Sequence, residues 1–183
     1  MVVAKREGVQ VKFLVGDARK IDKVVGNECF DVILYYWSSV LGYYDEDVDY
    51  EILVRCGKIV KDRGRLMILQ HINRDYLALA FSIRRVLEDS QDLGDYIIVE
   101  TSRFDLLPSR FISTWSLYKK ERNILTLIDR LETLQRVYLL HELVKIANKT
   151  GWMFEKVYAS LRTLEEFTKP THHMTYNLVF KPS

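Results

Sequence analysis

The feature that most constrains the fold is the run Phe30–Tyr36, which after Asp31 is apolar on both faces of an extended chain. A strand with one face in water alternates polar and apolar residues, whereas a strand covered on both faces is almost continuously apolar. The run therefore predicts a buried strand in a mainly parallel sheet. Such a sheet needs helices packed against it, so the rest of the chain should follow an α/β pattern.

The segments on either side of this run fit that pattern. Val9–Val15 has valine or phenylalanine at every second position and predicts an earlier strand, followed by a short helix at Ala18–Val25. After the run, acidic residues crowd the start of a helix that opens at Asp45. We expect Gly64 to end that helix in a left-handed conformation.

Two further elements complete the first half of the chain. Arg65–Ile72 is mostly apolar and predicts a third strand. Asn73 is a suitable N-cap for a helix that runs from Arg74 to about Leu87.

From Tyr96 the pattern changes to β-branched and aromatic segments separated by charged or turn-like breaks. The segments are Ile97–Asp105, Arg110–Lys119, Asn123–Leu131 and Thr133–Leu139. We interpret residues 96–139 as an antiparallel sheet inserted into a partial α/β core that spans residues 1–95. Residues 140–183 then return to the core with a helix at His141–Thr150 and strands at Trp152–Leu161 and Thr175–Lys181.

Composition narrows the class of protein. The chain has 27 Lys plus Arg and 25 Asp plus Glu, and the resulting net charge of +2 gives no electrostatic reason to expect nucleic acid or a membrane as partner. Cys29 and Cys56 are too few for a disulfide framework or a cysteine zinc site. No apolar run is long enough to span a bilayer, and the N-terminus has no secretion signal. We expect a cytoplasmic protein.

Several of these segments together resemble a known family. Val11–Asp17 with Ala18 and Arg19, followed by Phe30–Leu34, resembles the third and fourth strands of a class I S-adenosylmethionine-dependent methyltransferase. Ile59–Leu69 is similar to the helix end and fifth strand, with Asp62-Arg63-Gly64 in place of the usual turn. Trp37–Tyr44 and Arg136–Leu143 are similar to segments of the small-molecule subgroup, which carries an antiparallel insert.

The resemblance implies a Rossmann-like methyltransferase sheet that lacks its first strands. It also implies methyl transfer from S-adenosylmethionine to a small-molecule acceptor, which the insert would roof. The chain contains no Gly-x-Gly loop, and residues 1–8 look like the end of the helix before the third strand. The first two strands would then come from an upstream sequence, a cut polypeptide or a separate chain. The alternative is a non-catalytic methyltransferase-like subunit that has lost donor binding.

The resemblance also assigns candidate residues for the donor. Asp17, with Ala18 beside it, would accept a hydrogen bond from the adenine amino group. The alternative for Asp17 is a helix N-cap. Tyr35, Tyr36 and Trp37 would border the methyl-donor site, unless they are core residues.

Candidate residues for the acceptor are less specific. Tyr43, Arg136 and Tyr138 would face the acceptor, although Arg136 and Tyr138 could equally form an exposed cross-strand pair. His71 is a weak candidate for a general base, and a histidine hydrogen bonded at a strand end is the alternative. His172 and His173 have no third ligand at a suitable spacing, so we expect no metal site.

The missing strands would leave Val9–Val15 and one edge of Phe30–Tyr36 without neighbours. Unpaired apolar edges are prone to pair with other chains. We therefore expect a homodimer, or a tight complex with a missing N-terminal fragment, with contacts at residues 1–16.

Overall fold

The computed structural model describes residues 8–37, 40–84, 86–168 and 175–183, and contains two four-stranded sheets. The first sheet has the strand order β1-β2-β8-β7, and the second has the order β3-β4-β5-β6. The strands are β1 Phe30–Tyr36, β2 Val60–Ile72, β3 Leu87–Asp92, β4 Tyr96–Asp105, β5 Arg110–Glu121, β6 Ile124–Arg136, β7 Trp152–Tyr158 and β8 Thr175–Pro182. The helices are η1 Ala18–Lys20, α2 Ile21–Val25, α3 Glu46–Gly57, α4 Arg74–Ile83 and α5 Leu140–Lys149. None of these helices is long and apolar enough to cross a membrane.

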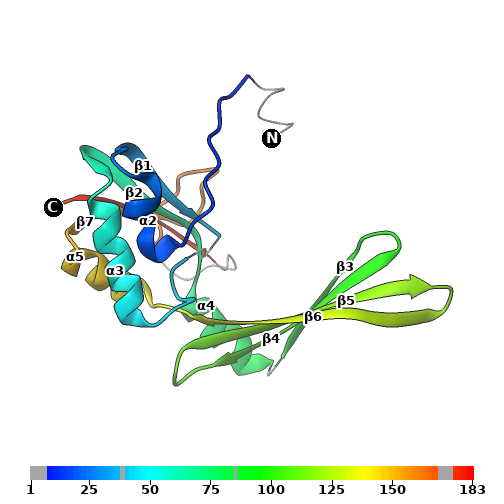
Figure 1. Cartoon of the computed structure of the whole chain (residues 1–183). Helices are drawn as coiled ribbons and strands as arrows, with labels where there is room; N and C mark the ends of the chain where they lie inside the picture. The colour runs from blue at the N-terminus through cyan, green and yellow to red at the C-terminus, as the bar shows by residue number, and fades with distance from the viewer. Residues whose placement is uncertain (1–7, 38–39, 85, 169–174) are drawn as a thin grey trace.

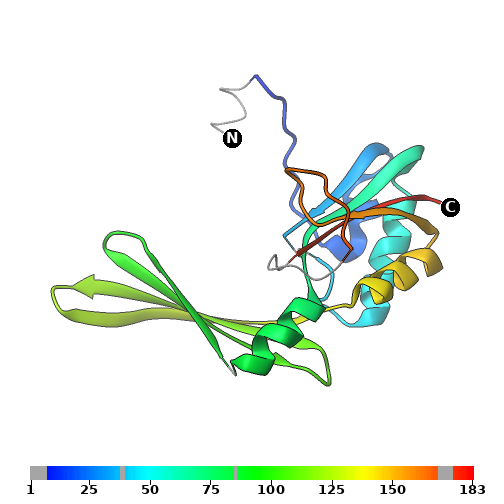
Figure 2. The same ribbon diagram turned by 180° about the vertical axis from the view of Figure 1, so that it is seen from behind.

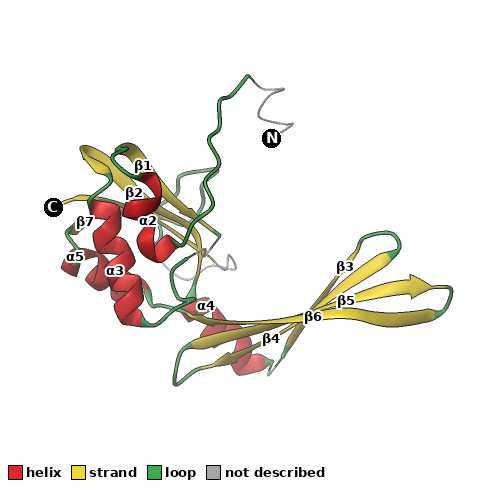
Figure 3. Cartoon of the chain, viewed as in Figure 1, coloured by secondary structure: helices red, strands yellow, loops and turns green. Residues whose placement is uncertain are grey.

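The two sheets form separate parts of the molecule. Figure 1 shows the first sheet with α2, α3 and α5 in one α/β body, while the second sheet extends from it as an arm. Seen from behind in Figure 2, α4 lies where the arm leaves that body. The secondary structure in Figure 3 shows that the arm is almost entirely strand. The mixed α/β body with an antiparallel insert confirms the predicted fold class.

The predicted buried strand is β1, which pairs in parallel with β2 in a register that joins Tyr35 to Ile68. β8 lies between β2 and β7 and is antiparallel to both. The core lies between this sheet and the helices, where Ile33, Leu66 and Leu178 are buried. These buried residues form one hydrophobic core with residues of α3 and α5, such as Ile52 and Leu143.

The opposite face of β1 is not covered by the described residues. Val32, Leu34 and Tyr36 point to this face, and each is about half exposed. The prediction that both faces of β1 are buried is therefore wrong for this chain. The apolar residues are present, but no helix in the described part of the chain lies over them.

The strand predicted at Val9–Val15 is also absent. Residues 9–15 have no strand partner, and Val9, Phe13 and Val15 are exposed. The segment extends away from the α/β body in Figure 1. An extended segment becomes a strand only when another strand satisfies its N–H and C=O groups, and the described residues provide none beside it.

Two boundaries differ from the sequence prediction. α3 ends at Gly57, and Gly64 lies inside β2, where a Cβ would be only 2.9 Å from the Asp31 carbonyl oxygen. This glycine allows close approach of β1 and β2, rather than ending a helix. The insert begins at Leu87 instead of Tyr96, because the polar segment Leu87–Asp92 forms strand β3 against β4.

Three further elements differ in extent. The strands predicted separately at Asn123–Leu131 and Thr133–Leu139 form the single strand β6, α4 ends at Ile83 and not near Leu87, and β2 begins at Val60 and not at Arg65.

The start of α4 and the end of α5 agree with the prediction. The side chain of Asn73 accepts a hydrogen bond from the Tyr76 N–H at 3.0 Å and caps α4. α5 ends before Gly151, which has a φ of +86°. The last two segments form β7 and β8 as expected.

Candidate functional site

A cavity of about 620 Å³ lies between the α/β body and the arm. One wall comes from the carboxyl ends of β1 and β2 and the loop after β1, and the other from the arm. The lining residues are Trp37, Tyr43, Gln70, Ile72, Asp89, Ser90, Gln91, Ile98, Glu100, Phe111, Ser113, Trp115, Thr133 and Gln135. Ligands of open α/β sheets bind outside the carboxyl ends of the strands, so this cavity is the candidate site.

The wall from the α/β body is shaped by two residues with positive φ. Trp37, directly after β1, has a φ of +62°, and Gln70, within β2, has a φ of +54°. The Trp37 N–H donates to the Leu69 carbonyl oxygen at 3.0 Å, and the Gln70 N–H donates to Asn177 Oδ1 at 3.0 Å. These bonds fix both strand ends, and Trp37 remains 76% exposed at the cavity.

The wall from the arm is one face of its sheet. Asp89, Glu100, Trp115 and Leu131 are paired in one row across β3, β4, β5 and β6, so their side chains share a face. The first three of them line the cavity. The arm therefore presents two carboxylates and an indole ring to the strand ends of the α/β body.

The arm is attached through close backbone contacts. The Arg136 N–H donates to the Gly42 carbonyl oxygen at 2.7 Å, and Gln135 Nε2 donates to the Leu41 carbonyl oxygen at 3.1 Å. Gly42 has a φ of +88°, and a Cβ there would lie 2.1 Å from the Arg136 carbonyl oxygen. Only glycine fits between the loop after β1 and the end of β6.

A buried carboxylate supports the same junction. Asp49 of α3 accepts hydrogen bonds from the Gly42 N–H at 2.8 Å and from the Tyr138 hydroxyl at 2.7 Å. Burial raises the pKa of Asp49 to about 6, against the opposing effect of these two bonds. Asp49 thus joins α3, the loop and the segment after the arm.

Tyr138 and Arg136 were expected to face the acceptor, but their contacts lie at this junction. Tyr138 is 1% exposed and bound to Asp49, so it belongs to the core and does not face the cavity. The Arg136 guanidinium lies over the Tyr138 ring at 5.0 Å and pairs with Glu142 at 3.3 Å. Both side chains hold α5 against the end of the arm, and only Tyr43 of the three acceptor candidates lines the cavity.

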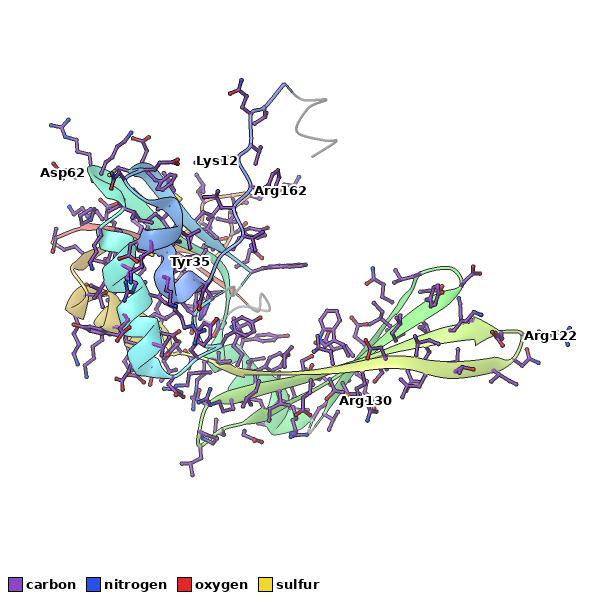
Figure 4. The ribbon with its side chains drawn as sticks, in the orientation of Figure 1. Lys12, Tyr35, Asp62, Arg122, Arg130 and Arg162 are labelled. Atoms are coloured by element: carbon purple, nitrogen blue, oxygen red, sulfur yellow. The ribbon has the colours of Figure 1, made fainter. Side chains whose placement is uncertain are left out.

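The three aromatic residues at the end of β1 point in different directions. Tyr35 is 5% exposed and its hydroxyl lies 2.8 Å from Cys56 Sγ, inside the α/β body, where Figure 4 labels it. Its side chain is therefore a core residue rather than part of a donor site. Tyr36 lies on the uncovered face, and Trp37 lines the cavity. Ser38 and Ser39 lie outside the described residues.

Asp17 forms the cap that the sequence offered as its alternative role. Its carboxylate accepts from the Arg19 N–H at 2.9 Å and from the Arg19 guanidinium at 2.8 Å. These bonds hold the pKa of Asp17 below its usual value. Ala18 begins η1 directly after it. The role of these two residues in donor binding stays a prediction.

His71 is not where a general base for the cavity would be. The irregularity of β2 at Gln70 leaves Gln70 and Ile72 lining the cavity and turns His71 to the buried side, where it is 1% exposed opposite Tyr176. Neither ring nitrogen has a hydrogen-bond partner among the described residues. Burial lowers the pKa of His71 to about 4, so the ring is neutral near pH 7.

Within the described part of the chain, no group of three or more His, Cys, Asp or Glu residues could hold a metal ion. His172 and His173 lie outside the described residues.

The sequence prediction missed Gln70, Glu100 and Trp115. Gln70 lines the cavity because of its positive φ within β2, and nothing in the sequence indicates that backbone conformation. Glu100 and Trp115 lie in predicted strands, but their shared face depends on the register between β4 and β5, which alternation within one strand does not define.

No family model and no curated protein matches the chain. Solved structures do match it. An S-adenosylmethionine-dependent methyltransferase from Clostridium acetobutylicum ATCC 824 has a TM-score of 0.75 at 11% identity, covering 100% of this chain and 69% of that one. The CcbJ methyltransferase from Streptomyces caelestis has a TM-score of 0.73 at 16% identity, covering 92% and 62%.

A third match is S-adenosylmethionine-bound CalS10, an amino pentose methyltransferase from Micromonospora echinaspora. Its TM-score is 0.62 at 11% identity, covering 92% of this chain and 63% of that one. The chain thus has a methyltransferase-like fold and spans roughly two thirds of the length of these structures. The resemblance inferred from the sequence is confirmed at the level of fold.

Proposed function

We propose that this chain is the C-terminal portion of an S-adenosylmethionine-dependent methyltransferase that acts on a small molecule. The observation that supports this most is the cavity between the strand ends of β1 and β2 and the antiparallel arm. Its volume and its mixture of aromatic and polar groups suit a small ligand. In this proposal the arm and Tyr43 contact the acceptor, and Trp37 separates the acceptor from the donor.

The residues present fit only part of the donor. None of the eight glycines belongs to a Gly-x-Gly loop, which would let the backbone approach the cofactor. The carboxylate of Asp17 is occupied by Arg19. S-adenosylmethionine would supply an electrophilic methyl group when bound, but we derive no step of the reaction from these residues.

We further propose that another polypeptide segment covers β1. β1 is the edge of its sheet, and Val32, Leu34 and Tyr36 form an exposed apolar face beside that edge. Strands and helices from the same longer protein, a separate fragment or a second copy would bury these groups. A non-catalytic role, in which this surface serves only for interaction, is the second candidate, and the same exposed face favours it.

We expect the 183-residue chain alone to bind S-adenosylhomocysteine weakly or not at all. The reason is that the sequence contains no Gly-x-Gly loop and that none of the described residues covers the exposed face of β1. Isothermal titration calorimetry measures this directly, and a micromolar dissociation constant would contradict it. Addition of a segment that covers β1 should restore binding. Covering β1 without any gain in affinity would favour the non-catalytic alternative.

Asp17→Ala tests the predicted adenine contact in such a binding-competent assembly. Loss of a hydrogen bond to a carboxylate should weaken binding by about 1–3 kcal/mol. Because the substitution also removes the cap of η1, a second variant, Arg19→Ala, is needed, which leaves the carboxylate in place but removes its ion pair. If calorimetry gives the same affinity for Asp17→Ala and the unmodified chain, Asp17 is a cap only.

A further inference from the structure

Two carboxylates lie directly opposite each other on the cavity face of the arm. Asp89 of β3 and Glu100 of β4 are register partners, and both line the cavity. Like charges directly opposite on neighbouring strands repel each other and destabilise the pairing. The cavity wall therefore has an electrostatic cost that a bound cation would relieve.

Glu100 is held in place by two hydroxyl groups. Ser102 donates to Glu100 Oε1 at 3.2 Å, and Ser113 donates to the same oxygen at a shorter distance. Both serines are buried. Among the described residues, Oε2 has no partner, so one carboxylate oxygen remains for a ligand.

No basic side chain among the described residues compensates these charges within the cavity. The lining contains no lysine, arginine or histidine. Across the sheet, the row that contains the two carboxylates continues with Trp115 and Leu131. Trp115 brings an indole beside Glu100, and aromatic faces attract cations.

We propose that this cavity binds its small molecule through a protonated amine, held by Glu100 and Asp89 beside the Trp115 ring. The inference deepens the proposed function, because it gives the acceptor an amine group as its anchor. The polar side chains of Gln91 and Thr133 on the same wall suit hydroxyl groups on the rest of such a molecule.

The test uses matched pairs of probes with the intact chain and needs no methyl donor. Cyclohexylamine is compared with cyclohexanol, and glucosamine with glucose, by ligand-observed NMR titration near neutral pH. We expect each amine to bind about tenfold or more tightly than its partner, since a charge-assisted hydrogen bond distinguishes the two. Added salt should reduce the difference.

Glu100→Gln assigns the preference to the site. Glutamine keeps an oxygen for the two serine hydroxyls but removes the charge, so the preference for the amine should fall by most of its size. Glu132→Gln is the matched control, because Glu132 is paired with Thr114 and faces the opposite side of the arm. This control should leave the preference unchanged.

The inference would be overturned by equal binding of amine and alcohol, by no binding of either amine, or by an unchanged preference in Glu100→Gln. A preference that disappears equally in both variants would also overturn it, because it would then follow the net charge of the arm. These results differ from failure of the proposed function. A chain that prefers amines but never acquires donor binding would retain this site and lose the methyltransferase assignment.

Discussion

Gly42→Ala is expected to lower the free energy of unfolding by about 3–4 kcal/mol. Two costs combine, because the added methyl group meets the Arg136 carbonyl oxygen at 2.1 Å and the residue must keep a φ of +88°. Relief of the clash would move the loop away from the end of β6. Such a shift would also break the hydrogen bond from Arg136 to Gly42 and the bond from Gly42 to Asp49.

Gly94→Ala separates these two costs. Gly94 lies between β3 and β4 with a φ of +79°, and a Cβ there meets nothing within 4 Å. It should therefore lose only about 1 kcal/mol, from the backbone conformation. Urea denaturation of both variants measures the difference. Equal losses would show that the junction between arm and body can move without cost.

The second prediction concerns pH, and rests on two buried groups with opposite effects. The pKa of His71 falls from 6.5 in the unfolded chain to about 4, so the fold is destabilised as pH decreases through this range. The pKa of Asp49 rises from 3.8 to about 6, so the fold is destabilised as pH increases through its range. Each effect amounts to about 3 kcal/mol. In the unmodified chain they nearly cancel between pH 4 and 6.

Single substitutions should expose each effect. In Asp49→Asn the side-chain oxygen still accepts from Gly42 and Tyr138, and stability relative to the unmodified chain should rise by about 3 kcal/mol from pH 4 to 6.5, because the opposing effect of Asp49 is removed. In His71→Leu stability should fall over the range from pH 4 to 6. Unfolding free energies relative to the unmodified chain at each pH remove the contribution of all other groups. If the stability of the two variants changed with pH in the same direction, the opposite effects assigned to Asp49 and His71 would be wrong.

The sequence was sufficient for elements whose partners are in the chain. β1, α3 and α5 were predicted because their apolar residues follow the period of the element and pack on one another. Val9–Val15 has a strand pattern too, but a pattern specifies only which groups could pair. Whether a strand forms also depends on a neighbouring strand that can pair with it, and the residues of the segment itself do not show whether one is present.

The candidate site was predicted only in its general place. Trp37 and Tyr43 were among the predicted site residues, and both line the cavity. Tyr138 and His71 were misplaced for a physical reason. Tyr138 is drawn into the core by the buried carboxylate of Asp49, and His71 is turned inward by the irregularity at Gln70. Neither long-range contacts nor backbone irregularities have a residue signature.

The position of the arm within the chain affects how the first sheet can close. β2 and β8 are neighbours, although the whole arm lies between them in sequence. The arm is a series of hairpins, so each of its strands meets a partner nearby in the chain, at a small loss of chain entropy. Once it has formed, the first residues of β3 and the last residues of β6 lie at the same end of its sheet. The connection that must then be ordered to bring β8 to β2 is effectively shorter, and each halving of a flexible loop reduces the entropic cost by roughly 0.6 kcal/mol.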